Sequence, residues 1–133
     1  MNVVHWAATM AGKLVAAPGG LGGQCVDLAN LYMLARGFKE VHANAIDWAK
    51  AGTLPPPWHW VANAPLNHPH LGDLAVWGEE SAVGTGQYGH IAVVLAGDAL
   101  ELLSLDQDWP IGSPASLVLH DYRGVRGWWA HDA

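Results

Sequence analysis

The feature that most constrains this chain is its only cysteine, Cys25, which lies where a glycine-rich stretch gives way to a helical pattern. Residues 18–23, PGGLGG, break a preceding helix. From residue 24 onward, apolar residues recur at spacings of three and four, which is typical of a helix. Free backbone N–H groups at a helix start favour the thiolate form of a cysteine. The alternative is a buried structural cysteine, the commoner fate of a lone cysteine.

A histidine with matching chemistry opens an apolar strand later in the chain. Of the eight histidines, His90 alone is followed directly by such a strand, in the run GHIAVV at residues 89–94. An imidazole can take the proton of a thiol and later give it to a leaving amine. Cys25 and His90 are thus the two halves of a cysteine-nucleophile hydrolase. The alternative for His90 is a polar strand-end residue that is hydrogen-bonded to a turn.

A catalytic base also needs a group that orients it. A turn at Gly97-Asp98 predicts a hairpin, and pairing of its strands would bring Asp106 close to His90. Asp108 lies two residues on and could share the same face. A solvated acidic strand end is the alternative reading of both carboxylates.

The residue before the cysteine offers a further role. Gln24 could donate its side-chain amide to a developing oxyanion, beside the backbone N–H of Cys25.

The pattern along the chain places helices first and strands later, which favours an α+β fold with an antiparallel sheet. Helices are expected over residues 2–15, 24–35 and 43–51. About five strands are expected, over residues 73–77, 90–96, 100–105, 117–120 and 125–129. An irregular connection is expected from the Pro55-Pro56-Pro57 run to about Gly72.

Length and charge exclude several classes of protein. A chain of 133 residues is enough for one domain with a modest core. A net charge of −6 with only six Lys plus Arg argues against nucleic acid as a partner. No segment has the roughly 20 apolar residues of a membrane span, and the N-terminus lacks the pattern of a signal peptide. We therefore expect synthesis in the cytoplasm, no membrane insertion and a monomer.

Several short motifs together resemble the CHAP domain, the cysteine- and histidine-dependent amidohydrolase/peptidase family of the papain-like superfamily. They lie in order over nearly the whole chain, and each is weak alone. The motifs are GQCVD at 23–27, Gly37, ANA at 43–45, GDLAVW at 72–77, GHIAVV at 89–94, DQDW at 106–109 and VRGW at 125–128.

The resemblance implies a papain-like α+β fold in a single catalytic domain, residues 1–133. It implies hydrolysis of an amide bond in bacterial peptidoglycan, by an N-acetylmuramoyl-L-alanine amidase or a cross-bridge endopeptidase. Members of the family are phage endolysins, phage tail enzymes or bacterial autolysins. Cys25 matches the nucleophile of the family and His90 matches the base. Such an enzyme would reach the wall through holin pores, on a phage particle or by a secretion system.

The third position departs from the family, which usually shows Glu-Gln-Asn-Trp where this chain has residues 106–109. Asp106 would replace the glutamate and Asp108 the asparagine, and either could orient His90. An acid in place of an amide adds negative charge, which should raise the pKa of the imidazolium and favour a thiolate–imidazolium pair.

No metal or other cofactor is expected. Some CHAP domains bind calcium through an acidic loop before the cysteine, but here that loop, residues 17–22, has no carboxylate. His68 and His70 flank a proline and have no cysteine nearby, so a zinc site is the weaker reading and a loop the better one.

Six of the eight tryptophans are expected either in the core or along a groove. Trp48, Trp77 and Trp128 are expected in the core. The walls of a substrate groove between the cysteine helix and the sheet are expected from Trp58, Trp60 and Trp109.

Two other functions stay open. The chain could be a catalytically silent module that binds the wall or has a structural role. It could also be a cysteine hydrolase that acts on a non-wall amide.

Overall fold

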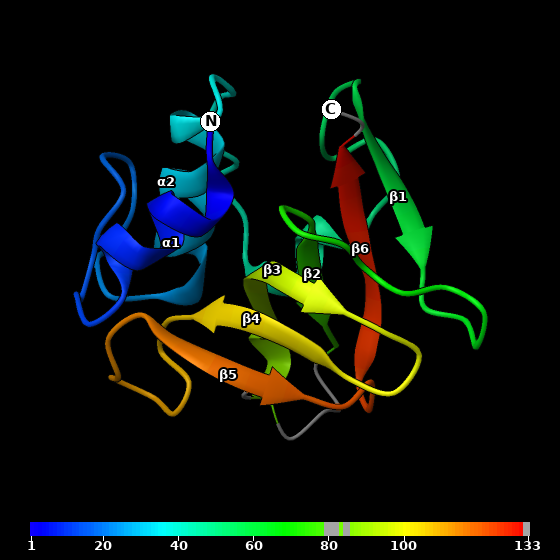
Figure 1. Ribbon diagram of the computed structural model, residues 1–133. Coiled ribbons are helices and arrows are strands. Elements are labelled where there is room, and N and C mark those ends of the chain that lie inside the picture. Colours follow the sequence, from blue (N-terminus) through cyan, green and yellow to red (C-terminus); the bar gives the residue numbers. More distant parts are fainter. Residues whose placement is uncertain (79–82, 84–85, 132–133) are drawn as a thin grey trace.

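A six-stranded antiparallel sheet in the order β1-β6-β2-β3-β4-β5 forms the centre of the fold. The computed structural model describes residues 1–78, 83 and 86–131. The strands are β1 (Trp58–Ala62), β2 (Leu74–Trp77), β3 (His90–Gly97), β4 (Leu102–Asp106), β5 (Ser116–His120) and β6 (Val125–His131). Figure 1 shows the sheet strongly curved, with β1 and β6 at the right and β4 and β5 crossing below.

Two α-helices precede the sheet, and two 3₁₀ turns lie in the connections. These elements are α1 (Val3–Met10), α2 (Cys25–Ala35), η1 (Ala45–Trp48) and η2 (Gly86–Tyr88). Helix α1 begins because the Asn2 side chain accepts a hydrogen bond from the His5 amide at 2.9 Å. Helix α2 ends at Ala35, and Gly37 two residues later has a φ of +86°, which suits glycine. Both helices lie at the left in Figure 1, beside the end of the sheet that carries β3 and β4.

The sheet buries apolar side chains on both faces, because neighbouring residues of a strand point to opposite sides. On one face, residues such as Val76, Ile91 and Leu105 pack with α1 and α2 in the larger core. On the other face, Trp77 and Trp128 belong to a second cluster. Trp48, Trp77 and Trp128 are all buried, as expected from the sequence. Within the described residues, no helix has the length and apolar character needed to cross a membrane.

The first and third helices are shorter than the sequence predicted. Helix α1 ends at Met10 rather than at residue 15, because Gly12 has a φ of +85° and the chain then becomes extended. Lys13 accepts a hydrogen bond from the Ala115 amide at 2.8 Å, so this segment bonds with the β4–β5 connection instead of continuing the helix. The helix expected over 43–51 is only the single turn η1.

Strand β1 is the sixth strand, which the sequence analysis missed. It lies in the stretch that was expected to be irregular, directly after the triple proline. Its hydrogen bonds go to β6, with Trp60 opposite Trp129. Because β6 is distant from β1 in the sequence, no local pattern predicts that the two strands pair. Five residues between prolines have the pattern of a loop.

Candidate active site

Cys25 is the first residue of α2 and lies half-buried on the wall of a cavity of about 360 Å³. The first turn of a helix carries backbone N–H groups that have no acceptor within the helix itself, and Cys25 lies at that end of α2. Asn44 lines this cavity and also two further cavities. The cavity wall is made by Leu21, Gln24, Cys25, Val26, Asn44, Ala45, Tyr88, Gly89 and Asp108.

The loop in front of Cys25 is held by the buried carboxylate of Asp27. It accepts hydrogen bonds from the backbone amides of Ala17 at 3.0 Å, Gly22 at 3.2 Å and Gln24 at 3.1 Å. A side chain at Gly20 would collide with the same carboxylate, so the loop closes tightly on it. Both oxygens of Asp27 are therefore engaged by the protein itself.

This loop does not fit a calcium ion. Calcium takes six to eight oxygen ligands, several of them carboxylates, whereas Asp27 is already bonded to three amides and residues 17–22 add no carboxylate. More generally, in the part of the chain that the structure describes, no three His, Cys, Asp or Glu side chains are placed to hold a metal.

Gln107 ties the same loop to the end of β4. Its side chain accepts from the Val15 amide at 2.7 Å and donates to the carbonyls of Val15 at 3.0 Å and Gln24 at 2.9 Å. Gln107 is fully buried, so these hydrogen bonds hold the backbone segment that leads to Cys25. The sequence analysis included Gln107 in the motif at residues 106–109 but gave it no role.

His90 is the first residue of β3 and is only 1% exposed. Its Nε2 lies 2.7 Å from Oδ2 of Asp106, the last residue of β4. The Cys25 side chain is near enough to the imidazole to act on it, since a side-chain hydrogen bond and charge from Cys25 are among the causes that raise the pKa of His90. Because Nε2 faces Asp106, Nδ1 is the nitrogen left for the sulfur. The structure thus brings together the cysteine, the histidine and one of the two candidate carboxylates.

The position of His90 depends on Gly89. Gly89 has a φ of +70°, and a Cβ there would lie 2.5 Å from the Trp77 carbonyl oxygen and 2.9 Å from Ile46 Cβ. Gly89→Ala is expected to lower the free energy of unfolding by about 2–4 kcal/mol, through backbone strain and overpacking. Thermal and denaturant unfolding measure this loss.

Gly52→Ala is the matched control for that prediction. Gly52 also has a positive φ, of +85°, but nothing lies within 4 Å of an added Cβ. Gly52→Ala should therefore lower the free energy of unfolding only through backbone strain, by about 1 kcal/mol. Equal losses at Gly52 and Gly89 would show that close packing behind His90 is unimportant.

The electrostatics of the site favour a charged imidazole. Burial by itself disfavours the imidazolium, but hydrogen bonds and negative charge from Asp106 and Cys25 outweigh burial and raise the pKa of His90 to about 9. Burial also acts to raise the pKa of Asp106, yet hydrogen bonds from His120 and His90 hold it below its usual value. At neutral pH the site therefore holds a protonated His90 against an ionised Asp106.

Two further side chains bind Asp106. Nε2 of His120, the last residue of β5, lies 2.9 Å from the same Oδ2 that His90 contacts. The Ser104 hydroxyl donates to Oδ1. The sequence analysis missed both residues. The only available signals were the place of His120 at the end of an apolar strand and the position of Ser104 two residues before Asp106, on the same strand face.

Asp108 was the other candidate for orienting His90, but none of the described hydrogen bonds joins the two residues. It sits in the β4–β5 connection with a φ of +64°, and its Oδ1 accepts a hydrogen bond from the Gly112 amide at 2.6 Å. Its carboxylate stabilises that turn and lines the Cys25 cavity. Asp106, the last residue of β4, is the carboxylate that contacts His90 and is placed to orient it.

Gln24, the candidate oxyanion donor, directly precedes Cys25 at the start of α2. It is exposed and lines the Cys25 cavity, and its own backbone is held by Asp27 and Gln107. Trp109 also lies near the site, with its ring centre 6.4 Å from that of His90.

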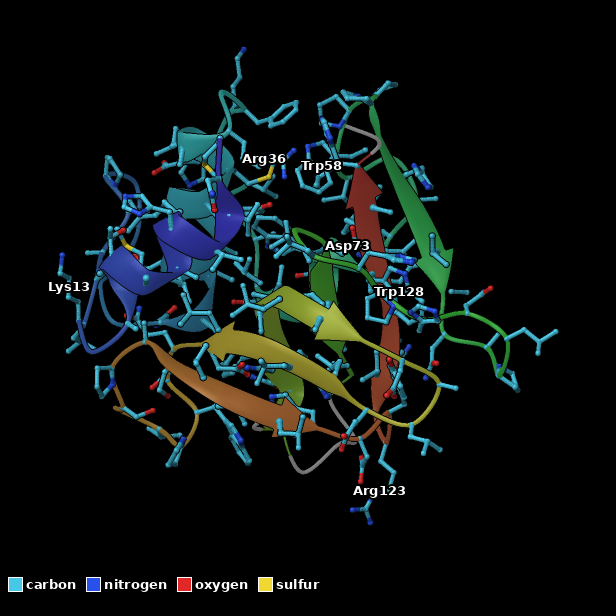
Figure 2. All side chains as sticks on the ribbon, viewed as in Figure 1. Lys13, Arg36, Trp58, Asp73, Arg123 and Trp128 are labelled. Carbon is cyan, nitrogen blue, oxygen red and sulfur yellow. The ribbon has the colours of Figure 1, made fainter. Side chains whose placement is uncertain are left out.

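Two of the three expected groove walls are elsewhere. Trp58 is 4% exposed and packs between Phe38 and His131, with the Arg36 guanidinium 5.7 Å from its ring centre. Figure 2 shows Arg36 and Trp58 beside each other between α2 and β1. Trp60 packs on Trp129. Both belong to or pack against the core because strand β1 carries them to the far edge of the sheet.

Comparisons with known proteins agree with the fold. A family model described as CHAP domain matches residues 16–105, a region that contains Cys25 and His90 and ends one residue before Asp106. The structure is similar to that of the endolysin LysIME-EF1, with 28% sequence identity and a TM-score of 0.79. That match covers 97% of this chain and 62% of the endolysin chain.

Two more distant structures share the fold alone. Ly7917 matches with 15% identity and a TM-score of 0.69, covering 97% of this chain and 60% of Ly7917. PlyC matches with 16% identity and a TM-score of 0.66, covering 96% of this chain and 34% of the PlyC chain. The present chain thus spans about three fifths of the length of the first two proteins, and less of PlyC.

Proposed function

The chain belongs to the CHAP domain family, and on that premise we propose that it hydrolyses an amide bond of bacterial peptidoglycan with Cys25 as the nucleophile. The observation that carries the proposal is the chain of contacts from Cys25 through His90 to Asp106 at the wall of an open cavity. A thiol, a base and a group that orients the base are the parts of a cysteine hydrolase.

In the first step, the Cys25 thiolate attacks the carbonyl carbon of the amide. The carbonyl oxygen becomes an oxyanion, which the backbone N–H of Cys25 and the side-chain amide of Gln24 would stabilise. His90 then donates its Nδ1 proton to the leaving amine, the carbon–nitrogen bond breaks and a thioester remains on the sulfur. Asp106 holds the imidazole through Nε2 and stabilises its positive charge during this step.

In the second step, neutral His90 takes a proton from a water molecule, whose oxygen attacks the thioester carbonyl. The carbon–sulfur bond breaks, the acid product leaves, and Cys25 returns to the thiolate beside a protonated His90. The raised pKa of His90 favours this resting pair.

The bond cut is either the one between muramic acid and L-alanine, as in an amidase, or a peptide bond of the cross-bridge, as in an endopeptidase. The Cys25 cavity and the two further cavities that share Asn44 with it would accommodate an extended substrate, with Trp109 as one wall. We propose that residues 1–133 act as a single catalytic domain and a monomer at the cell wall. The enzyme would reach the cell wall through holin pores, on a phage particle or by a secretion system.

The pH dependence of this mechanism has an alkaline limit set by His90. Its pKa is raised to about 9, so it stays protonated through neutral pH and loses its proton as the pH rises through that value. Without this proton the amine departs slowly. We therefore expect kcat/KM to fall above about pH 9, in a profile measured on a soluble peptidoglycan fragment. A fall already complete by pH 7 would contradict the ion pair.

The proposed reaction class is tested on purified peptidoglycan by counting the new chain ends. Amide hydrolysis releases amino groups and produces no new reducing sugars, whereas cleavage of the glycan produces reducing ends and no amines. We expect amines only. A protein and a small-molecule amide, offered in parallel, test the alternative of a non-wall substrate. Cleavage of these with none of the wall would overturn the proposal.

A further inference from the structure

The carboxylate that holds His90 is itself enclosed by side chains from three strands, β3, β4 and β5. Asp106 has no exposed surface. Oδ2 lies 2.7 Å from Nε2 of His90 and 2.9 Å from Nε2 of His120, and Oδ1 accepts the Ser104 hydroxyl. An ionised carboxylate can only accept hydrogen bonds, so both imidazoles donate to it through Nε2.

These donors differ in what happens to them during turnover. His90 changes its protonation state in each proposed step, while His120 and Ser104 hydrogen-bond to Asp106 and are not among the residues that line the substrate cavity described above. A buried carboxylate with a single, changing partner would reorient to find others. The bonds from His120 and Ser104 keep Asp106 in place whatever the state of His90.

Packing fixes His120 in turn. It is 7% exposed, and its ring centre lies 4.7 Å from that of the fully buried Trp77. The same indole lies 5.2 Å from the ring of His90, so it packs against both imidazoles. The described titratable groups that face His120 are Asp106, His90 through that carboxylate, and Asp121, which is half-exposed at the next position. Asp106 is the single buried anion among these groups, and both His90 and His120 bind it.

We propose that His120, assisted by Ser104, is a positioning residue that fixes the short Asp106 side chain so that it orients His90. The inference rests on the proposed use of Cys25 and His90 as a catalytic pair. Removing the Nε2 donor of His120 should therefore lower the fraction of molecules in which the His90 imidazole is held toward the Cys25 sulfur.

The test compares His120→Gln with His120→Asn. A glutamine amide can reach the position of Nε2 and donate to Asp106, whereas an asparagine amide ends near the position of Nδ1. Both are neutral amides, so they differ mainly in reach. His120→Leu removes every donor, and His5→Leu, at an exposed histidine of α1, is the control for the substitution itself.

The readout is the rate at which iodoacetamide alkylates Cys25, the only cysteine, between pH 5 and 10. This rate reports the thiolate–imidazolium pair without any peptidoglycan. We expect His120→Asn and His120→Leu to react about tenfold more slowly at pH 7, and His120→Gln and His5→Leu to remain within about threefold of the wild type. Circular dichroism and thermal unfolding show which variants are folded.

Equal alkylation profiles for folded Gln and Asn variants would overturn the inference. If His120→Leu does not fold, the comparison of Gln with Asn decides the question, and Ser104→Ala offers a second, milder loss of a donor. A wild type with a reactive Cys25 that cleaves no wall would refute the proposed substrate but leave this role of His120 intact.

Discussion

Cys25→Ala is expected to lower the rate of amide hydrolysis by at least about 10⁴-fold, because the chain has no other thiol to form the acyl intermediate. Hydrolysis is measured as the release of amines from purified peptidoglycan. Binding to the same material, measured by co-sedimentation, should remain, since the cavity around residue 25 keeps its shape.

Cys25→Ser is the matched control because it preserves size and a hydrogen-bonding atom. Its hydroxyl is a far weaker nucleophile at neutral pH, so it too should be nearly inactive. Full activity of Cys25→Ala would exclude the cysteine mechanism. Binding by the wild type without any hydrolysis would instead favour the silent wall-binding module.

Asp106→Asn is expected to lower kcat by about 10²–10⁴-fold with little change in KM. An amide at this position turns an NH₂ group toward one of its donors, so it cannot accept from His90, His120 and Ser104 together. It also removes the negative charge that helps to raise the pKa of His90. The alkaline limit of activity should therefore move to lower pH. Steady-state kinetics and the pH profile measure both effects.

Asp108→Asn makes the same chemical change two residues away. Asp108 accepts a bond from the Gly112 amide, which an asparagine oxygen can also accept, and asparagine tolerates its positive φ. Alkylation of Cys25 should stay within about threefold of the wild type in this variant. The reverse outcome, with Asp108→Asn impaired and Asp106→Asn normal, would reassign the orienting residue.

The central features of the site could be predicted because each lies at the boundary of a local pattern. Cys25 begins a helix after a glycine loop, and His90 begins an apolar strand. The choice between Asp106 and Asp108 could not be made, because it depends on strand register. The structure has an irregularity in the β3–β4 pairing between Val94 and Ala96, which no sequence pattern specifies.

The residues that were missed or misplaced depend on contacts between distant parts of the chain. Strand β1 exists because it pairs with β6, so Trp58 and Trp60 lie in or against the core and not at a groove. His120 contacts Asp106 only because β5 folds beside β4. Eight histidines in one chain left no means to single it out before the sheet was known.

The measurement that tests the central claim most directly is mass spectrometry of purified peptidoglycan digested by the wild type and by Cys25→Ala. The account predicts new fragments in the wild-type digest alone. Free lactyl carboxyl groups on muramic acid would identify an amidase, and new peptide termini an endopeptidase. Identical spectra for the two proteins, across walls of several cross-link types, would contradict the claim that Cys25 hydrolyses an amide bond of the cell wall.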